Sequence, residues 1–213
     1  MKKLLTLTAL AAFAVSAFGQ GQIIFQNRDT ATTPPITAAV YLDVVGTGTV
    51  GALAGADYRA ALLGGALGAT PWAVSAIGVS GGTGLQMLAS PASGATWVTF
   101  RTGAAAGYVA VGTDSARVVP GVDWNATGVF QMVAWSGGFN TWEAAVDAAK
   151  TNLTVRIGAS NPLELKLPSG PTDPNITKLV GLQPFAIVQV PEPSMFALAG
   201  LGAAALTIFR RRK

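Results

Sequence analysis

The sequence predicts an all-β domain, a β-sandwich or jelly roll with one short helix, followed by a single C-terminal transmembrane helix. Short stretches in which apolar and polar residues alternate recur through the middle of the chain, as in half-buried strands. Clusters of Gly, Pro, Asn and Ser separate these stretches, and about ten short strands with such breaks are typical of sandwiches. Both termini instead carry a continuous apolar run beside basic residues, so they are treated as separate segments.

The segment 1–19 has the three-part pattern of a secretory signal peptide. Two lysines stand near its start, an apolar stretch runs from Leu4 to Phe18, and the small residues Ala17 and Gly19 occupy positions three and one before Gln20. We therefore predict that the secretion translocon exports the chain and that cleavage occurs before Gln20, with cleavage after Ala17 as the alternative. Residues 20–189 then form the predicted extracytoplasmic domain.

Ten stretches of this domain are predicted to be strands. Leu163–Leu167 alternates between leucines on one face and charged residues on the other, whereas Val129–Trp135 is apolar on both faces, as expected for a central strand. The Gly- and Ala-rich segment Gly46–Gly68 fits either a loop or a pair of strands whose backbones approach closely. The predicted strands are Gln22–Gln26, Ala38–Asp43, Tyr58–Leu63, Trp72–Val79, Thr96–Arg101, Tyr108–Val111, Val129–Trp135, Leu153–Ile157, Leu163–Leu167 and Phe185–Gln189.

One helix is predicted after Gly137-Gly138. Asn140 can cap its N-terminus, and Glu143 stands three residues later, as in a capping box. Four apolar residues then recur at helical spacing on one face: Trp142, Ala145, Val146 and Ala149. We expect this helix to pack across an end of the sandwich.

The segment 190–213 reads as a membrane anchor with an exposed motif before it. Its apolar run, Met195 to Phe209, is 15 residues long and spans roughly 22 Å as a helix, short of the hydrocarbon core of about 30 Å. It can still insert if the bilayer thins or if flanking groups reach the interface. Prolines on either side of Glu192 should keep the preceding stretch extended. That stretch is Val190, Pro191, Glu192 and Pro193, and the cytoplasmic basic anchor is Arg210, Arg211, Arg212 and Lys213.

The Pro-Glu-Pro triplet, the apolar run and the terminal basic cluster, in this order within 190–213, closely resemble the PEP-CTERM sorting signal. The resemblance implies recognition by exosortase, an integral-membrane, cysteine-dependent processing enzyme. It implies a membrane-anchored precursor that is then moved to the cell surface or to an exopolysaccharide-rich matrix. Scattered stretches of the middle also resemble exported PEP-CTERM proteins of Verrucomicrobia and their relatives, a group without an assigned activity. They are Phe25–Asn27, Leu53–Leu62, Gly128–Trp135, Thr141–Ala145, Gly158–Ser160 and Leu179–Phe185.

Composition excludes several classes of function. The net charge of +4 arises at the termini, since the middle has eight basic and nine acidic residues, and it therefore gives no support to nucleic-acid binding. The chain contains no Cys and no His, which removes disulfides, thiolate or imidazole catalysis and Cys- or His-ligated metals. We predict no catalytic residue, no metal and no cofactor.

Exposed aromatic residues and carboxylates leave two alternatives open. Trp97, on a polar strand face, and Trp124, in a turn, could stack on sugars, whereas Trp135 and Trp142 should fill the core. Six carboxylates could run glycoside hydrolysis, although nothing in their spacing selects a pair: Asp57, Asp114, Asp123, Glu143, Asp147 and Glu164. Asp123, Asn125 and Thr127 alternate like calcium ligands, but Ala134 replaces the terminal Glu of such a loop, which favours a turn.

The favoured hypothesis is therefore a non-enzymatic surface or matrix protein, processed at Pro191–Pro193. Its expected partners are exosortase, the translocon, the membrane before processing and extracellular polysaccharide. The alternative is a carbohydrate-binding module that contacts exopolysaccharide through Trp97 and Trp124, and a carboxylate-dependent hydrolase is the third hypothesis.

Overall fold

The computed structural model describes residues 20–43, 50–75 and 78–190, together with Leu201. The predicted signal peptide 1–19, the apolar run Met195–Phe209, apart from Leu201, and the basic anchor Arg210–Lys213 lie outside these residues. Within them the chain is mostly β with one short α-helix, as the sequence predicts. No helix of the described ranges combines the length and the apolarity needed to cross a bilayer.

Nine of the described strands form one large mixed sheet, in which β6 (Tyr58–Ala66) and β12 (Thr127–Ser136) are central neighbours, with β10 (Val98–Thr99) beside β6 and β13 (Arg156–Ala159) beside β12. β6 and β12 run antiparallel over nine residue pairs, from Gly128 opposite Ala66 to Ser136 opposite Tyr58. β9 (Gln86–Met87) pairs with β6 beside β10, and β14 (Leu163–Lys166) pairs with β12 beside β13. The order across the sheet is β10 (Val98–Thr99), β6 (Tyr58–Ala66), β12 (Thr127–Ser136), β13 (Arg156–Ala159), β16 (Phe185–Gln189), β4 (Val40–Asp43) and β5 (Val50–Leu53).

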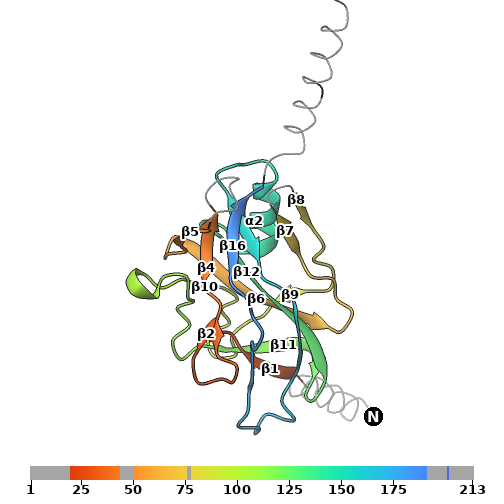
Figure 1. The fold of residues 1–213 in the computed structure, drawn as a ribbon. Coiled ribbons are helices and arrows are strands. Elements are labelled where there is room, and N and C mark those ends of the chain that lie inside the picture. The colour runs from red at the N-terminus through yellow and green to blue at the C-terminus, as the bar shows by residue number, and fades with distance from the viewer. Residues whose placement is uncertain (1–19, 44–49, 76–77, 191–200, 202–213) are drawn as a thin grey trace, which may run out of the picture.

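A second, smaller sheet consists of β11 (Ala116–Asp123), β1 (Gln20–Ile24) and β15 (Thr177–Lys178). Two short hairpins complete the described strands. One is β2 (Arg28–Asp29) with β3 (Ile36–Thr37), and the other is β7 (Ala73–Ser75) with β8 (Gly78–Ser80). Figure 1 shows β1 and β11 at the bottom of the view, and β7 and β8 beside the helix at the upper right.

The two central strands of the large sheet are buried on both faces, because different elements cover each face. Alternate residues of β12, such as Phe130 and Met132, share a core with Ile23 of β1 and Val119 of β11. The residues between them, such as Val133, pack under the helix and under β7 and β8 instead. The predicted central strand Val129–Trp135 is thereby confirmed, and its unbroken apolar run follows from burial on both sides.

Helix α2 (Trp142–Ala149) presents the predicted apolar face, with Trp142, Ala145, Val146 and Ala149 buried. Its N-cap is Thr141 rather than Asn140, because the Thr141 side chain accepts a hydrogen bond from the backbone N–H of Ala144. The helix packs on the face of the large sheet against β12 and β13, not across an end of the fold. A wide apolar stripe with two tryptophan neighbours needs a broad partner surface, which a sheet face provides.

Three strand predictions were wrong in detail. Of the predicted strand Leu153–Ile157, only Arg156 and Ile157 lie in a strand, which is β13. The predicted strand Trp72–Val79 is the β7–β8 hairpin, and in Tyr108–Val111 only an isolated bridge between Val109 and Phe100 forms. In Gly46–Gly68, β5 and β6 are both strands, yet they do not pair with each other, since β5 joins β4 and β6 joins β12. Residues 44–49 of this segment lie outside the described ranges.

Strand β11 was missed because Pro120-Gly121 has the composition of a turn. The pairing with β1 is irregular at this point, with Val119 opposite Gly21 and Asp123 opposite Gln20. Pro120 falls within the irregularity, where no regular ladder bond is required, and Gly121 has a φ of 74°. The strand therefore continues through a dipeptide that would end most strands.

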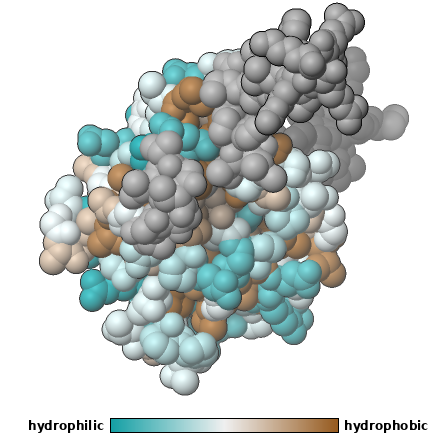
Figure 2. Space-filling model, turned by 45° about the horizontal axis from the view of Figure 1, so that its top comes forward, coloured by the Kyte–Doolittle hydropathy of each residue, from teal (hydrophilic) through white to brown (hydrophobic). Residues whose placement is uncertain are grey.

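The surface of the described residues is mixed. In the face drawn in Figure 2, apolar residues lie as separate small groups among polar ones. The large apolar side chains that are exposed on the folded domain are Leu67, at the end of β6, and Leu153, between α2 and β13. Exposed leucines at separate positions are ordinary and do not by themselves indicate an interface.

Candidate functional site

The strand β16 connects the folded domain with the predicted sorting segment. It is held on both sides, antiparallel to β13 and parallel to β4. Gln189 lies opposite Arg156, and the Arg156 guanidinium donates a hydrogen bond of 3.3 Å to the backbone carbonyl of Asp43 in β4. The last strand before the tail is thus an interior strand of the large sheet, not a loose edge.

Val190, the first residue of the predicted motif, belongs to the core. It is 4 % exposed and lies in the same apolar cluster as Trp135, Val155 and Ile157. Glu192 follows Val190 after one intervening residue, Pro191. The acidic residue of the motif is therefore separated from the buried core by a single residue of sequence.

The other predicted residues of the two processing segments lie outside the described residues. They are Pro191, Glu192 and Pro193, the basic residues Arg210, Arg211, Arg212 and Lys213, and Ala17 and Gly19 before the predicted signal cleavage. Gln20, just after that cleavage point, is the first residue of β1 and lies opposite Asp123 of β11. The predicted mature N-terminus therefore lies in strand β1.

Trp97 is half-buried next to β10. The guanidinium of Arg59 lies over its ring, 3.8 Å from the ring centroid, and also donates to the carbonyl of Phe139 and to Asn140 Oδ1. Part of the aromatic surface that was predicted to stack on sugars is thus covered by a cation from β6.

Trp124 lies in the turn between β11 and β12 and is also half-buried. The structure does not bring it together with Trp97. Trp97 precedes Val98, which pairs with Ala60, whereas Trp124 precedes the end of β12 at which Gly128 pairs with Ala66. These points on β6 are roughly 20 Å apart along the strand. Trp97 and Trp124 therefore do not form one aromatic surface, and sugar stacking on each stays a separate prediction.

The remaining tryptophans form an aromatic cluster in the core under α2. Trp135 and Trp142 are fully buried, as predicted, with ring centroids 6.0 Å apart. Trp72 meets Trp142 edge-on at 5.8 Å. The buried amide of Gln131 accepts a hydrogen bond from Trp72 N and donates to Trp72 O, each at 2.8 Å, which fixes the backbone at this ring.

The carboxylates with displaced pKa values all stabilise local structure. Hydrogen bonds from Ser90 and Ser93 lower the pKa of Asp114 below its usual range, and backbone N–H groups of Asn175 and Ser169 lower the pKa of Asp173. Among the described residues no group of three acidic side chains could hold a metal ion. Asp123, Asn125 and Thr127 surround a tight turn in which Asn125 has a φ of 63°, in agreement with the turn predicted there.

A small hollow beside β2 was not predicted. It has a volume of about 100 Å³, and its lining includes Arg28, Arg101 and Tyr108. Arg28 and Arg101 are far apart in the sequence, and neither belongs to a recognisable motif. Only the pairing of Phe100 with Val109 and the contacts of Asn27 bring the two arginines to one place, so the sequence carries no signal for this site.

Comparison with known protein families finds the PEP-CTERM protein-sorting motif at residues 189–213. The matched range begins on the last residue of β16 and contains the Pro-Glu-Pro triplet, the apolar run and the basic end of the chain. Neither the curated proteins nor the solved structures contain a match to the chain. The resemblance of the middle to proteins of Verrucomicrobia stays a prediction.

Proposed function

We propose that this chain, which carries a PEP-CTERM motif and is thereby an exported target of exosortase, is a non-enzymatic protein of the cell surface or extracellular matrix. The observation that carries the proposal is the position of the motif, which begins at Gln189 inside the large sheet. The domain and its sorting signal are directly joined. In our proposal the domain is a β-sandwich, and it is the part of the chain that is delivered to the cell surface or matrix.

This junction constrains where processing happens. Exosortase is a membrane enzyme, and Glu192 is only two residues along the chain from buried Val190. Processing therefore takes place with the Val190 end of the domain close to the membrane surface. We propose that Met195–Phe209 spans the membrane in the precursor, with Arg210–Lys213 on the cytoplasmic side.

Release would leave the domain intact. Hydrogen bonds to β13 and β4 hold β16, and they lie on the domain side of Pro191. A cut at or after Pro191 removes none of these bonds and none of the described core. We therefore expect the released product to keep the stability of the precursor domain, as a surface or matrix component requires.

A non-enzymatic role agrees with how the polar side chains are used. The displaced carboxyl pKa values are lowered, whereas a general acid at neutral pH needs a raised one. The hydroxyl of buried Ser160 accepts from Met132 N and donates to the carbonyl of Asn161, so it supports the strand β12. These groups act as parts of the fold.

Fractionation of the source cells, with mass spectrometry of both ends of the protein, tests the proposal. We expect a mature N-terminus at or near Gln20, a C-terminus that lacks Arg210–Lys213, and recovery from the surface or matrix fraction. In Glu192→Gln and Pro191→Ala variants the full-length precursor should accumulate in the membrane fraction. Pro184→Ala is the matched control, because this exposed proline lies at the other end of β16, directly before Phe185, and outside the motif.

The result that would refute the proposal is recovery of the full-length chain, with its intact basic end, from the cytoplasm. Equal processing of the motif variants and of Pro184→Ala would refute the role of the Pro-Glu-Pro triplet.

A further inference from the structure

The hollow beside β2 lies between the segment Gln26–Arg28 and the segment from Arg101 to Gly112. Its volume of about 100 Å³ is below the roughly 300 Å³ of small pockets for whole ligands, so it fits one functional group with part of the molecule that carries it. Two arginines and no carboxylate line it within the described part of the chain. The site therefore favours an anion.

Both guanidinium groups retain free donors. Arg28 is exposed and stands over the ring of Tyr108, 5.1 Å from the ring centroid, and no other residue of the described ranges bonds to its guanidinium. Arg101 is also exposed, and its Nε donates to the carbonyl of Val109 at 3.3 Å. The terminal nitrogens of Arg101 have no partner among the described residues, so each arginine can present a planar pair of donors.

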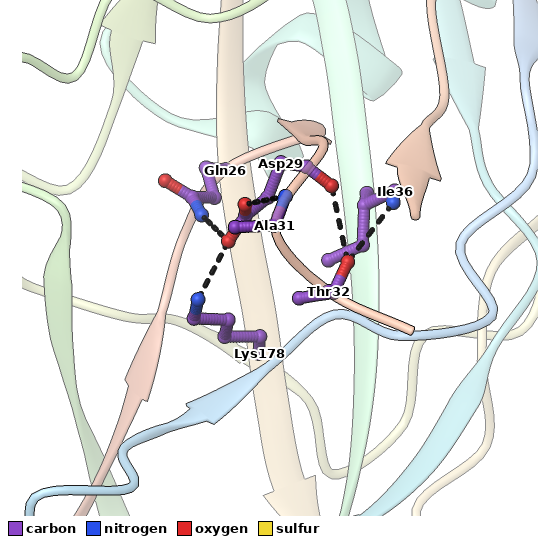
Figure 3. Close-up of polar contacts among 6 residues, drawn as sticks. All are labelled: Gln26, Asp29, Ala31, Thr32, Ile36 and Lys178. Atoms are coloured by element: carbon purple, nitrogen blue, oxygen red, sulfur yellow. Dashed lines mark hydrogen bonds and ion pairs between the residues drawn. The ribbon is translucent and has the colours of Figure 1, made fainter. Parts of the chain in front are cut away.

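Asp29, the acidic residue that follows Arg28 in the sequence, does not neutralise it. Asp29 Oδ2 accepts from Lys178 Nζ at 2.7 Å and from Gln26 Nε2 at 2.8 Å, while Oδ1 accepts from the backbone of Ala31 (Figure 3). The hydrogen bond from Lys178 is the largest cause that lowers the pKa of Asp29. The charges of Asp29 and Lys178 therefore neutralise each other, and Arg28 and Arg101 leave the hollow positively charged.

Asn27 makes the floor of the hollow rigid. Its side chain is fully buried, donates to the carbonyls of Ala38 and Gly107, and accepts from the backbone N–H of Val109. The bonds to Gly107 and Val109 join the two walls of the hollow. The backbone that carries the two arginines is therefore rigid, which lowers the loss of conformational entropy on binding.

We propose that this hollow binds the carboxylate of an acidic saccharide, such as a hexuronate unit of an extracellular polysaccharide. A carboxylate matches the planar donor pairs of Arg28 and Arg101. Gln26 also lines the hollow, and its side-chain oxygen points away from Asp29, so it can accept a hydrogen bond from a sugar hydroxyl. A site that offers both the donor pairs of the arginines and the acceptor oxygen of Gln26 suits a sugar acid better than a simple anion. The class of ligand rests on the proposed surface location.

Calorimetry with the full-length protein in a neutral detergent tests the site, using trigalacturonate as the probe at low salt. We expect binding that weakens as salt rises, since the attraction is between charges, and that is absent for the neutral sugar maltotriose. Arg28→Gln and Arg101→Gln should each weaken binding at least about tenfold, because each removes a charged pair of donors. Lys166→Gln is the matched control, because it removes an exposed positive charge outside the hollow.

Two further measurements distinguish a sugar-acid site from a site for any anion. Arg101→Lys keeps the charge and the fold but loses the planar fork, and we expect an affinity between those of the unmodified protein and Arg101→Gln. Acetate and inorganic phosphate should bind at least about tenfold more weakly than trigalacturonate, because neither carries a sugar ring that places a hydroxyl at Gln26 while the anion contacts the arginines.

Equal affinity of Lys166→Gln and the two arginine variants, or no binding of trigalacturonate, would overturn the proposal. Binding of phosphate as tight as that of trigalacturonate would also overturn it, because the ligand would be a simple anion. None of these results depends on sorting, since the assay uses purified precursor. A failure here is therefore distinct from a failure of the proposed export and processing.

Discussion

Gln189 lies opposite Arg156 in the antiparallel pairing of β16 with β13, so the first residue of the sorting motif is also the last residue of a sheet strand. The next residue, Val190, is buried under the same apolar cluster as α2. Domain and sorting signal consequently overlap by two residues. Changes at this junction can alter stability, sorting or both, and the two effects need separate measurements.

Val190→Ala should destabilise the domain by about 1–3 kcal/mol, because it removes apolar atoms from a packed cluster and leaves a small cavity. Chemical denaturation of the full-length protein measures the change. The matched control is Leu153→Ala, which truncates a leucine that is 41 % exposed and should change stability by less than about 0.5 kcal/mol. Equal effects of the two variants would contradict the burial of Val190. Because Pro-Glu-Pro is untouched, processing should continue in both.

Gln131→Leu should destabilise the domain strongly. Gln131 is buried and bonds to both backbone groups of Trp72 and to the carbonyl of Ser160. Leucine has a similar size but leaves these groups unpaired, which costs about 1–3 kcal/mol for each group that stays out of contact with water. Chemical denaturation monitored by tryptophan fluorescence measures the change in stability.

The control for this substitution is Gln86→Leu, in the short edge strand β9. Gln86 is exposed, and its amide reaches the carbonyl of Pro120 only at 3.5 Å. We expect little change in stability. If Gln131→Leu were as mild as Gln86→Leu, the buried amide would not fix the segment at Trp72.

Arg59→Gln should loosen the segment that leads into α2. The Arg59 guanidinium covers Trp97 and binds Phe139 O and Asn140 Oδ1, so its loss removes a cation–π contact and two charged hydrogen bonds. The expected destabilisation is about 1–3 kcal/mol. Hydrogen exchange should increase at residues 137–141 more than in β12. Unchanged hydrogen exchange at residues 137–141 would show that Arg59 does not hold this segment in place.

Acidification should destabilise the domain, and Asp114 should contribute. Its pKa is lowered in the folded state by the hydroxyls of Ser90 and Ser93, so the unfolded chain binds more protons as the pH approaches the usual carboxyl value near 4. The contribution is present above that value and is lost as the pH falls through the lower, folded value. Asp114→Asn and Ser90→Ala should therefore flatten the fall in stability below about pH 4.

Melting temperatures between pH 7 and pH 3 measure this effect. Ser115→Ala is the matched control, because its hydroxyl has no carboxylate partner among the described residues. Its melting profile should parallel that of the unmodified protein. Identical profiles for Asp114→Asn and the unmodified protein would remove Asp114 as a source of the acid sensitivity.

Several elements could be predicted because their signal is local. The last strand, Phe185–Gln189, has the predicted bounds, and the apolar face of α2 follows from helical spacing alone. The cap shifted by one residue because Asn140 and Thr141 are both good caps, and the contact of Asn140 with Arg59 lies outside any local pattern. In β11, the irregular pairing with β1 overrides the turn tendency of Pro120-Gly121.

The sequence by itself determined the mostly β class, the single described helix and the sorting motif, because periodicity, charge and motif order are properties of neighbouring residues. Only the tertiary structure decided that the motif begins inside the large sheet, that Arg59 covers Trp97, and that Arg28 and Arg101 share a hollow. The physical reason is that these relationships join residues far apart in the chain. Strand pairing and packing bring them together, and no short-range pattern encodes that partner choice.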